Sequence, residues 1–283
     1  MIRENYMNNS NRKNNTPSSM SEKALIEKIM NGPIPKHLCI IMDGNRRFAR
    51  LHEKLPILGH RKGADKLEEV LYWCKEIGIK FLTVYAFSTE NNNRSTEEIN
   101  YLMGIFEEYL EKAAENGKVH DNRIRIRVIG CRAGLPDGLI KAIQHTEERT
   151  KCYGSLIVNI ALNYGGREEI VRATRMICKE VMDGRISIED INEELVSSKL
   201  YTAGVPDPDL VIRTSGEKRI SNFLLWQIAN SDLYFSDAYW PALGKNDFLM
   251  AIYAYQKRKD RIDPILDDLF HYSLSGSISD KMK

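Results

Sequence analysis

The sequence HLCIIMDGNRR, residues 37–47, joins a short apolar run to a polar segment that contains a carboxylate, a glycine and two arginines. An apolar run without polar alternation is typical of a strand that is buried on both faces of a sheet. We therefore predict a buried strand over 37–42, with 43–47 directly after its carboxyl end.

Strand and helix patterns alternate along the rest of the chain. Short apolar or alternating runs predict further strands over 79–87, 123–130, 155–162, 209–214 and 232–235. Apolar residues at helical spacing predict helices over about 21–30, 67–77, 95–115, 136–150, 166–183, 188–199 and 246–261. This alternation predicts one α/β domain with a mainly parallel central sheet surrounded by helices.

Composition divides the chain into four parts. Residues 1–20 are polar and rich in asparagine, and we expect a disordered tail because little apolar surface offsets the entropy of ordering. A short helix and linker are expected over 21–34, a folded domain over 35–262 and a C-terminal tail over 263–283.

Charge and motif content exclude several protein classes. The 41 lysines and arginines nearly balance the 39 aspartates and glutamates, whereas a nucleic-acid coat protein needs a large basic excess. No apolar run approaches the ~20 residues of a transmembrane helix, and no secretory signal is visible. The five scattered cysteines form no CxxC pair, which argues against a zinc site and favours a reducing, cytoplasmic setting.

Polar residues follow four of the predicted strands, where α/β proteins bind ligands. These segments are 43–47, 88–94, 163–167 and 213–221. They are rich in arginine, asparagine, serine and glycine, which can serve as turn residues or together recognise phosphate groups. Two arginine clusters on different strands suggest two phosphorylated groups. No P-loop or GxGxxG motif follows a strand, so nucleotide chemistry is disfavoured.

Asp43 and the helix over 95–115 each allow two interpretations. A lone carboxylate among phosphate-binding cations suits Mg²⁺, although Asp43 could also serve as a turn or N-cap residue. The apolar stripe of the helix is either plain core or one wall of a hydrophobic tunnel for a lipid chain.

Five motifs, in this order, resemble those of the cis-prenyltransferases, the undecaprenyl and dehydrodolichyl diphosphate synthases. They are IIMDGNRRFA (40–49), GHRKGADKL (59–67), TVYAFSTEN (83–91), NYGGREEI (163–170) and DLVIRTSGEKRISNFLLWQIANSDLYF (209–235). The resemblance covers about 35–262, and the form DGNRRFA is more similar to archaeal and eukaryotic members than to bacterial ones.

The resemblance implies a parallel sheet with a hydrophobic tunnel, and a dimer. It implies a Mg²⁺-dependent condensation of isopentenyl diphosphate onto an allylic prenyl diphosphate, which yields a polyprenyl diphosphate, the precursor of a glycosyl carrier lipid. The enzyme is then expected in the cytoplasm or peripherally at the membrane, into which its product partitions.

The resemblance also implies roles for individual residues. Asp43 and Asn91 match the catalytic aspartate and the proposed proton acceptor, and Asp43 with Asp232 is expected to hold the metal. The allylic diphosphate site is expected to comprise Gly44, Asn45, Arg46, Arg47, Phe48, His60, Ser88, Thr89, Glu90 and Arg94. The isopentenyl diphosphate site is expected to comprise Arg213, Arg219, Ile220 and Ser221, and the tunnel to be lined by Ala86, Leu102 and Phe106.

Four positions depart from the family pattern. Asn92 replaces a bacterial tryptophan, Pro56 replaces a phosphate-contacting arginine, and Asp232 replaces a glutamate that shares the metal. The sequence RID at 261–263 replaces a C-terminal R-x-G. These changes bear on the choice of primer, the metal affinity and the ability of a homodimer to complete its own site.

Three functions and two assemblies therefore stay open. The chain is expected to be a polyprenyl diphosphate synthase, with a same-family enzyme of short or branched products and a noncatalytic support subunit as alternatives. A homodimer is expected, with a heteromer containing a second prenyltransferase-like subunit as the alternative.

Overall fold

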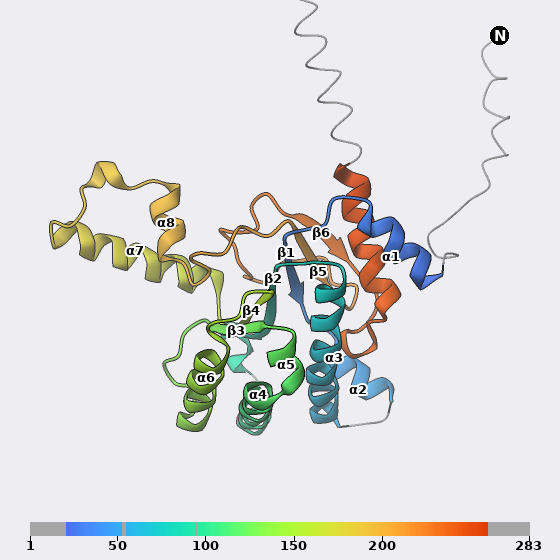
Figure 1. Cartoon of the computed structure of the whole chain (residues 1–283). Helices are drawn as coiled ribbons and strands as arrows, with labels where there is room; N and C mark the ends of the chain where they lie inside the picture. The colour runs from blue at the N-terminus through green and yellow to red at the C-terminus, as the bar shows by residue number, and fades with distance from the viewer. Residues whose placement is uncertain (1–20, 53–54, 94, 260–283) are drawn as a thin grey trace, which may run out of the picture.

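The computed structural model describes residues 21–52, 55–93 and 95–259, and its centre is a six-stranded sheet in which every neighbouring pair is parallel. The strand order is β3-β4-β2-β1-β5-β6 (Figure 1). The strands are β1 (His37–Ile41), β2 (Phe81–Ser88), β3 (Ile124–Ile129), β4 (Leu156–Tyr164), β5 (Leu210–Arg213) and β6 (Asp232–Phe235). Because β1 lies between β2 and β5, the segments that follow these three strands meet at one edge.

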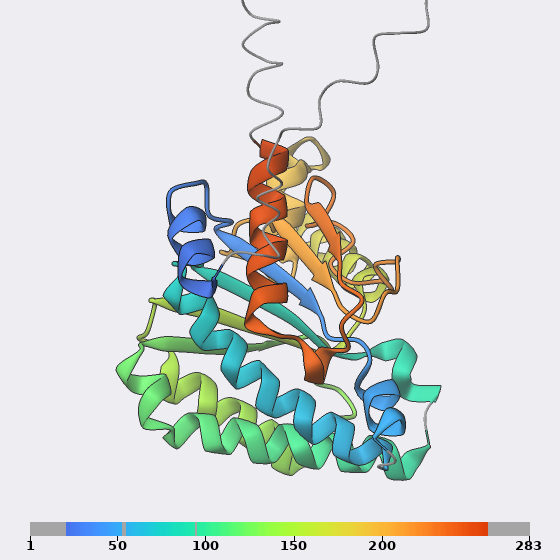
Figure 2. The ribbon, with the colours of Figure 1, turned by 90° about the vertical axis from the view of Figure 1, so that its right-hand side faces the viewer.

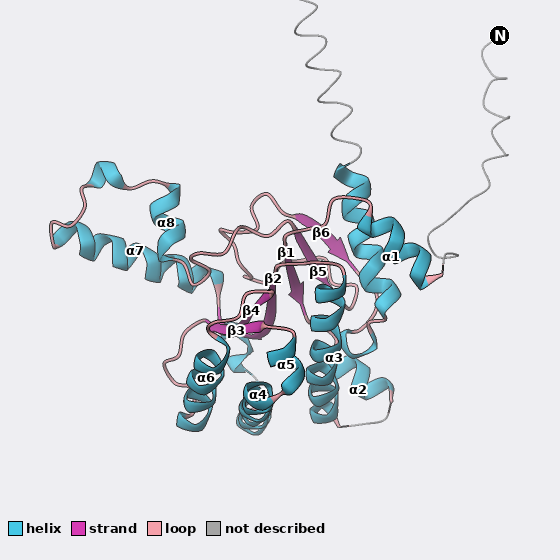
Figure 3. Cartoon of the chain, viewed as in Figure 1, coloured by secondary structure: helices cyan, strands magenta, loops and turns pink. Residues whose placement is uncertain are grey.

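Most of the helices cover one face of this sheet (Figures 2 and 3). The helices are α1 (Glu22–Met30), α2 (Asn45–Leu51), α3 (Pro56–Glu76), α4 (Thr96–Glu115), α5 (Gly117–Asp121), α6 (Asp137–Thr150), α7 (Gly166–Met182) and α8 (Glu193–Lys199). Short 3₁₀ helices are η2 (Thr89–Asn93), η3 (Ile188–Asp190) and η4 (Trp240–Ala242). A further helix over 245–259 reaches the end of the described residues.

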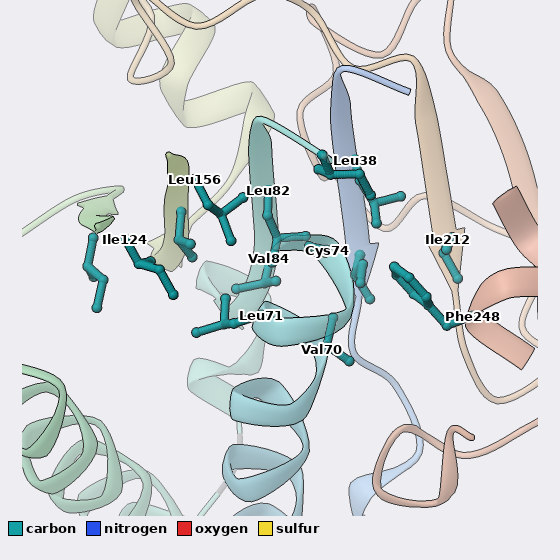
Figure 4. Packing of buried hydrophobic residues seen from close by; sticks show 14 of the residues in the cluster. Leu38, Val70, Leu71, Cys74, Leu82, Val84, Ile124, Leu156, Ile212 and Phe248 are labelled. Atoms are coloured by element: carbon teal, nitrogen blue, oxygen red, sulfur yellow. The ribbon is translucent and has the colours of Figure 1, made fainter. Parts of the chain in front are cut away.

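The main hydrophobic core lies between the sheet and these helices (Figure 4). Val70 and Cys74 of α3 pack there with Leu82 of β2, and Phe248 of the last described helix packs near Ile212 of β5. All five of these side chains are buried. Burial of each such side chain stabilises the fold by about 1.5–3 kcal/mol.

The opposite face of the sheet carries a smaller apolar cluster. Phe223 and Leu224 come from the segment after β5 and pack on Tyr85 and Ala161 of the sheet. Helices α7 and α8 project away from the body instead of covering this face (Figure 1). Among the described residues of a single chain, helices therefore do not enclose the sheet on both sides.

The predicted strands and the main helices are confirmed, and the differences have local causes. Helix α3 begins at Pro56, well before the first residue of the predicted pattern, because Gly59 packs against α2: a Cβ there would lie 2.1 Å from the Asn45 carbonyl oxygen. Helix α2 was not predicted. The predicted helix over 188–199 is interrupted, since the Asn192 side chain accepts a hydrogen bond from Leu195 N at 2.8 Å and starts α8 anew.

No helix among the described residues combines the length and hydropathy needed to cross a bilayer. The predicted tails over 1–20 and 263–283 lie outside the described residues, as do Arg94 and the RID segment at 261–263.

Candidate active site

Asp43 lies just beyond the carboxyl end of β1, beside the end of β5. Its backbone N–H donates to Thr214 Oγ1 at 2.9 Å, and its carbonyl oxygen accepts from Trp240 N at 3.0 Å. Ile41 of β1 is in register with Arg213 of β5. The polar residues at the ends of these two strands therefore lie close together. Thr214, which sequence analysis did not single out, thus fixes the backbone that carries Asp43.

Two guanidinium groups flank the Asp43 carboxylate. Arg213 Nη2 donates to Oδ2 at 2.8 Å, and Arg47 Nη2 approaches Oδ1 at 3.4 Å. The Arg213 side chain is only 4% exposed, whereas that of Asp43 is 29% exposed. The carboxylate therefore faces solvent between two cations, where an incoming diphosphate would contact the same arginines.

Gly44 is required by the turn that starts α2. Its φ of +105° lies in the left-handed region, and a Cβ would be 2.7 Å from the Tyr239 ring. Only glycine fits this conformation and this space without strain.

The structure joins the two predicted diphosphate sites into one cluster. Arg213 Nη1 donates to Ser221 Oγ at 2.7 Å and also to the Arg219 carbonyl oxygen. Glu217 lies between the sites: it accepts from Arg47 at 3.0 Å and also pairs with Arg219. The hydrogen bond from Arg219 and the positive charge of that guanidinium lower the pKa of the Glu217 carboxyl, and Arg47 adds a smaller effect in the same direction. Sequence analysis missed Glu217, although its place between two predicted arginines was a usable signal.

The segment after β5 is strained. Ser215, Ser221, Asn222 and Leu224 all have positive φ, which costs roughly 1–3 kcal/mol per residue outside glycine. Asn222 anchors the segment to the start of α7, since its carbonyl accepts from Gly166 N at 2.7 Å and its Oδ1 from Arg167 N at 2.9 Å. The motifs NYGGR and SGEKRISN are therefore one structural unit, which no spacing along the chain revealed.

Ile220 and Phe48, two of the predicted diphosphate-binding residues, make apolar packing contacts in this structure. Ile220 packs against the smaller apolar cluster, and the Phe48 ring lies 4.3 Å from that of His52.

The polar segment after β2 forms η2 at the same edge of the sheet. Ser88 is buried and its Oγ accepts from Glu90 N at 3.1 Å. Thr89 lies against the loop that follows β4, as the short distance of 2.7 Å between Thr89 Oγ1 and a Cβ placed on Gly165 shows. Asn91 is part of η2, so this segment is close to the loop that holds Asn222.

A second polar group lies where α2, α3 and α4 converge. Buried His60 Nε2 is 3.2 Å from Glu98 Oε1, and Arg46 Nε is 3.8 Å from the same oxygen. Asn45 Oδ1 is buried and has no hydrogen-bond partner among the described atoms. Asn45 and His60 both line the cavity that lies between the sheet and helices α3 and α4.

That cavity, of about 560 Å³, lies between the sheet and helices α3 and α4. Ala86, Leu102 and Phe106, the three predicted tunnel residues, all line it. Met42 and Asn45, the neighbours of Asp43 and Gly44 in sequence, line the same cavity. An apolar chamber therefore begins directly beside the cationic cluster.

Asp232 is not part of this cluster within one chain. It begins β6 in register with Leu210, which pairs with Leu38, so it lies roughly 15 Å before Asp43 along the strands. Its carboxylate instead pairs with Arg258 at 3.3 Å. The prediction that Asp43 and Asp232 hold one metal ion is therefore wrong for a single chain, because parallel register places the two residues at opposite ends of the strands.

The residues that remain fit Mg²⁺ in one particular way. Among the described residues no group of three or more acidic, histidine or cysteine side chains forms a protein cage for a metal. Mg²⁺ is commonly held by one or two carboxylates with substrate phosphate oxygens and water. The half-buried Asp43 carboxylate suits that arrangement when a diphosphate is bound.

Comparison with known proteins agrees with this geometry. Residues 41–263 match the model of the family described as putative undecaprenyl diphosphate synthase. The chain is 52% identical over 240 residues to a tritrans,polycis-undecaprenyl-diphosphate synthase (geranylgeranyl-diphosphate specific) of Pyrococcus horikoshii, covering 85% of this chain and 91% of the relative. A synthase of the same name from Thermoplasma acidophilum is 46% identical over 255 residues, covering 90% and 99%.

Two solved structures are also similar. Lavandulyl diphosphate synthase from Lavandula x intermedia, in complex with dimethylallyl diphosphate, has a TM-score of 0.76 and 35% identity, covering 79% of this chain and 95% of that one. A probable undecaprenyl diphosphate synthase from Campylobacter jejuni has a TM-score of 0.64 and 34% identity, covering 78% and 95%.

Proposed function

The chain belongs to the undecaprenyl diphosphate synthase family, the cis-prenyltransferases, and from this membership we propose that it extends geranylgeranyl diphosphate with isopentenyl diphosphate into a long polyprenyl diphosphate. The primer is taken from the names of the archaeal relatives, which are geranylgeranyl-diphosphate specific and match over nearly their whole length.

One observation carries the proposal: a carboxylate between two arginines lies next in the chain to Met42, which lines an apolar cavity. Arg47 and Arg213 can bind diphosphate oxygens beside Asp43, and the cavity of about 560 Å³ can receive the hydrocarbon chain. A prenyl diphosphate has one strongly anionic end and one apolar end. The site offers cations for the anionic end and an apolar cavity for the hydrocarbon end, within a few residues of each other.

The chemistry that follows is an alkyl transfer. The bond between allylic C1 and its diphosphate oxygen breaks, and the diphosphate leaves with the electron pair. The terminal alkene carbon of isopentenyl diphosphate bonds to C1, and a proton is lost from its C2. Magnesium held by Asp43 and the diphosphate would supply positive charge that stabilises the leaving group.

The protein groups divide this work between them. Arg47 and Arg213 stabilise the departing diphosphate by preorganised charge. Arg213, Arg219 and Ser221 bind the diphosphate of isopentenyl diphosphate. We assign removal of the C2 proton to Asn91 in η2, and positioning of the allylic group to Asn45 and His60, which line the cavity.

The test is product analysis. Purified protein is incubated with Mg²⁺, isopentenyl diphosphate and, in parallel, geranylgeranyl, farnesyl or dimethylallyl diphosphate. The proposal expects long products, made most efficiently from geranylgeranyl diphosphate. Absence of any condensation with all three primers would overturn it.

A second candidate function is favoured by one comparison. Lavandulyl diphosphate synthase, solved with dimethylallyl diphosphate, shares 35% identity and a TM-score of 0.76 with this chain. A short or branched product from dimethylallyl diphosphate in the same assay would support this alternative.

A noncatalytic support subunit is disfavoured by the intact site. Asp43, Arg47, Arg213 and Ser221 retain their mutual hydrogen bonds, which a chain without substrates has no need to preserve.

We also propose that the active form is a homodimer that pairs through the projecting helices α7 and α8. This arm exposes large apolar side chains, among them Met182 at 87%, Ile188 at 69% and Val171 at 50%. Exposed apolar groups gathered on one projection are typical of a protein interface. Light scattering should give a dimer, and Met182→Ser with Ile188→Ser should shift it toward monomer. A wild-type chain that is inactive until a second prenyltransferase-like protein is added would support the heteromer instead.

A further inference from the structure

The cavity beneath the sheet is open along one side. Its lining includes Asp65 and Glu68 of α3 and Lys112 and Glu115 of α4, and all four of these charged residues are exposed to solvent. A residue that lines a cavity and also faces solvent marks a place where the two meet. The cavity therefore reaches the surface along the seam between α3 and α4, which lie side by side in Figure 2.

Near the catalytic cluster this seam is closed by polar bridges. Arg61 of α3 forms two hydrogen bonds with Glu108 of α4, at 3.0 and 2.8 Å. One helical turn further along α3, Asp65 Oδ1 accepts from Tyr109 OH at 2.5 Å. The pKa of Glu108 is lowered to about 2, chiefly by hydrogen bonding to Arg61, so this bridge stays charged at neutral pH.

Farther from the cluster the bridges between the two helices end. Tyr72 OH bonds to Glu68 of its own helix, and Lys112 pairs with Glu108 of its own helix. Glu115 pairs with α6. Among the described residues, no hydrogen bond or ion pair joins α3 to α4 beyond Asp65 and Tyr109. Polar groups therefore bridge the two helices near the reacting end but not along the far half of the seam, where Lys118 of α5 lies 5.7 Å from the centre of the Tyr72 ring.

The cavity, of about 560 Å³, has to take up a chain that lengthens with every addition. An undecaprenyl chain has more than twice as many carbons as the geranylgeranyl primer. Each addition therefore moves the far end of the chain further from the diphosphates, toward the open side of the cavity.

We propose that the far end of the growing chain leaves sideways between α3 and α4, through a portal formed by Glu68, Tyr72, Lys112 and Glu115. This rests on the proposed function and deepens it, because it locates the path of the product. His60 to Tyr72 spans twelve residues of helix, roughly 18 Å at 1.5 Å per residue, so the portal lies well away from the diphosphates. The Arg61–Glu108 and Asp65–Tyr109 bridges, by contrast, keep the part of the cavity next to the reacting carbon closed.

The experiment cross-links the portal. Glu68→Cys and Lys112→Cys are introduced together in a chain in which exposed Cys152 and Cys178 are replaced by serine, and the two thiols are joined by a short bis-maleimide. Product lengths from geranylgeranyl and isopentenyl diphosphate are compared before and after cross-linking. We expect cross-linking to shorten the products by several isoprene units, while the rate of the first addition stays within about twofold of that before cross-linking.

The controls separate the possible failures. Each single-cysteine variant, treated with the same reagent, should keep its long products. An unchanged length distribution in the cross-linked protein overturns the portal. Lack of any polyprenyl product before cross-linking overturns the proposed function.

Discussion

Arg213 and Asp43 form an ion pair of 2.8 Å between neighbouring strands β5 and β1, and the Arg213 end of that pair is almost completely buried. The same guanidinium donates to Ser221 Oγ at 2.7 Å. One side chain thus connects the proposed metal-binding carboxylate to the predicted isopentenyl diphosphate site. We therefore expect Arg213 to couple the two substrates, so that variants of this residue affect both of them.

Asp43→Ala should abolish turnover. Loss of metal-assisted stabilisation of the leaving diphosphate should cost several kcal/mol, a fall of about a thousandfold or more in kcat. Steady-state kinetics on folded variant protein, checked by circular dichroism, provide the measurement. Asp121→Ala, an exposed aspartate at the end of α5, is the matched control. A kcat within tenfold of wild type would contradict the assigned role.

Arg219→Ala should act mainly on isopentenyl diphosphate. The Arg219 side chain is 62% exposed and its described partner is Glu217, so its removal leaves no buried charge unpaired. Loss of charge-assisted hydrogen bonds of about 1.5–3 kcal/mol predicts a KM for isopentenyl diphosphate raised roughly ten- to a hundredfold. Kinetics with each substrate varied in turn test this. An effect confined to the allylic primer would show that the two sites have been exchanged.

Arg213→Ala should behave differently from Arg219→Ala. It removes the bonds to both Asp43 and Ser221, so we expect kcat to fall and both KM values to rise. The same kinetic series provides the comparison. If only the KM for isopentenyl diphosphate changed, the coupling through Asp43 would be absent.

Ala86→Leu should shorten the products. Ala86 lines the cavity from β2, and a leucine there would occupy space that the chain needs. The first addition should proceed at a similar rate, because the substitution leaves the arginine cluster unchanged. Chain lengths are measured on extracted products, and an unaltered distribution would remove Ala86 from the path.

His37 predicts a dependence of stability on pH. It is buried, its Nδ1 is 2.6 Å from the Pro206 carbonyl oxygen, and its Nε2 is 2.8 Å from Thr83 Oγ1. Burial is the main cause that lowers its pKa from 6.5 to about 4. The unfolded chain therefore binds the proton more readily, and the stabilisation that is complete above pH 6.5 is lost as the pH falls toward 4.

Denaturant unfolding at several pH values tests this sign. The free energy of unfolding should fall by up to roughly 3 kcal/mol across that window because of His37. His37→Asn should lose this part of the pH dependence. A parallel pH profile in both proteins would assign the acid sensitivity to other groups.

Much of the fold followed from short-range patterns. The runs at 37–42 and 155–162 are apolar because both faces of their strands are buried. Such a run can be recognised in the sequence without knowing which strands lie beside it. The sequence pattern did not predict helix α2 or the first turns of α3. Their residues are polar or glycine, and Gly59 matters only because α2 packs against it.

The sequence by itself determined the composition of the site: Asp43, the arginines and the small residues stand directly after buried strands, and strand ends in a parallel sheet share an edge. Only the tertiary structure decided which of these residues meet. Parallel register brings Asp43 to Arg213 and separates it from Asp232, and Glu217 joins the two arginine groups across a strained loop. Register and loop conformation depend on contacts between segments far apart in the chain, so no local pattern could specify them.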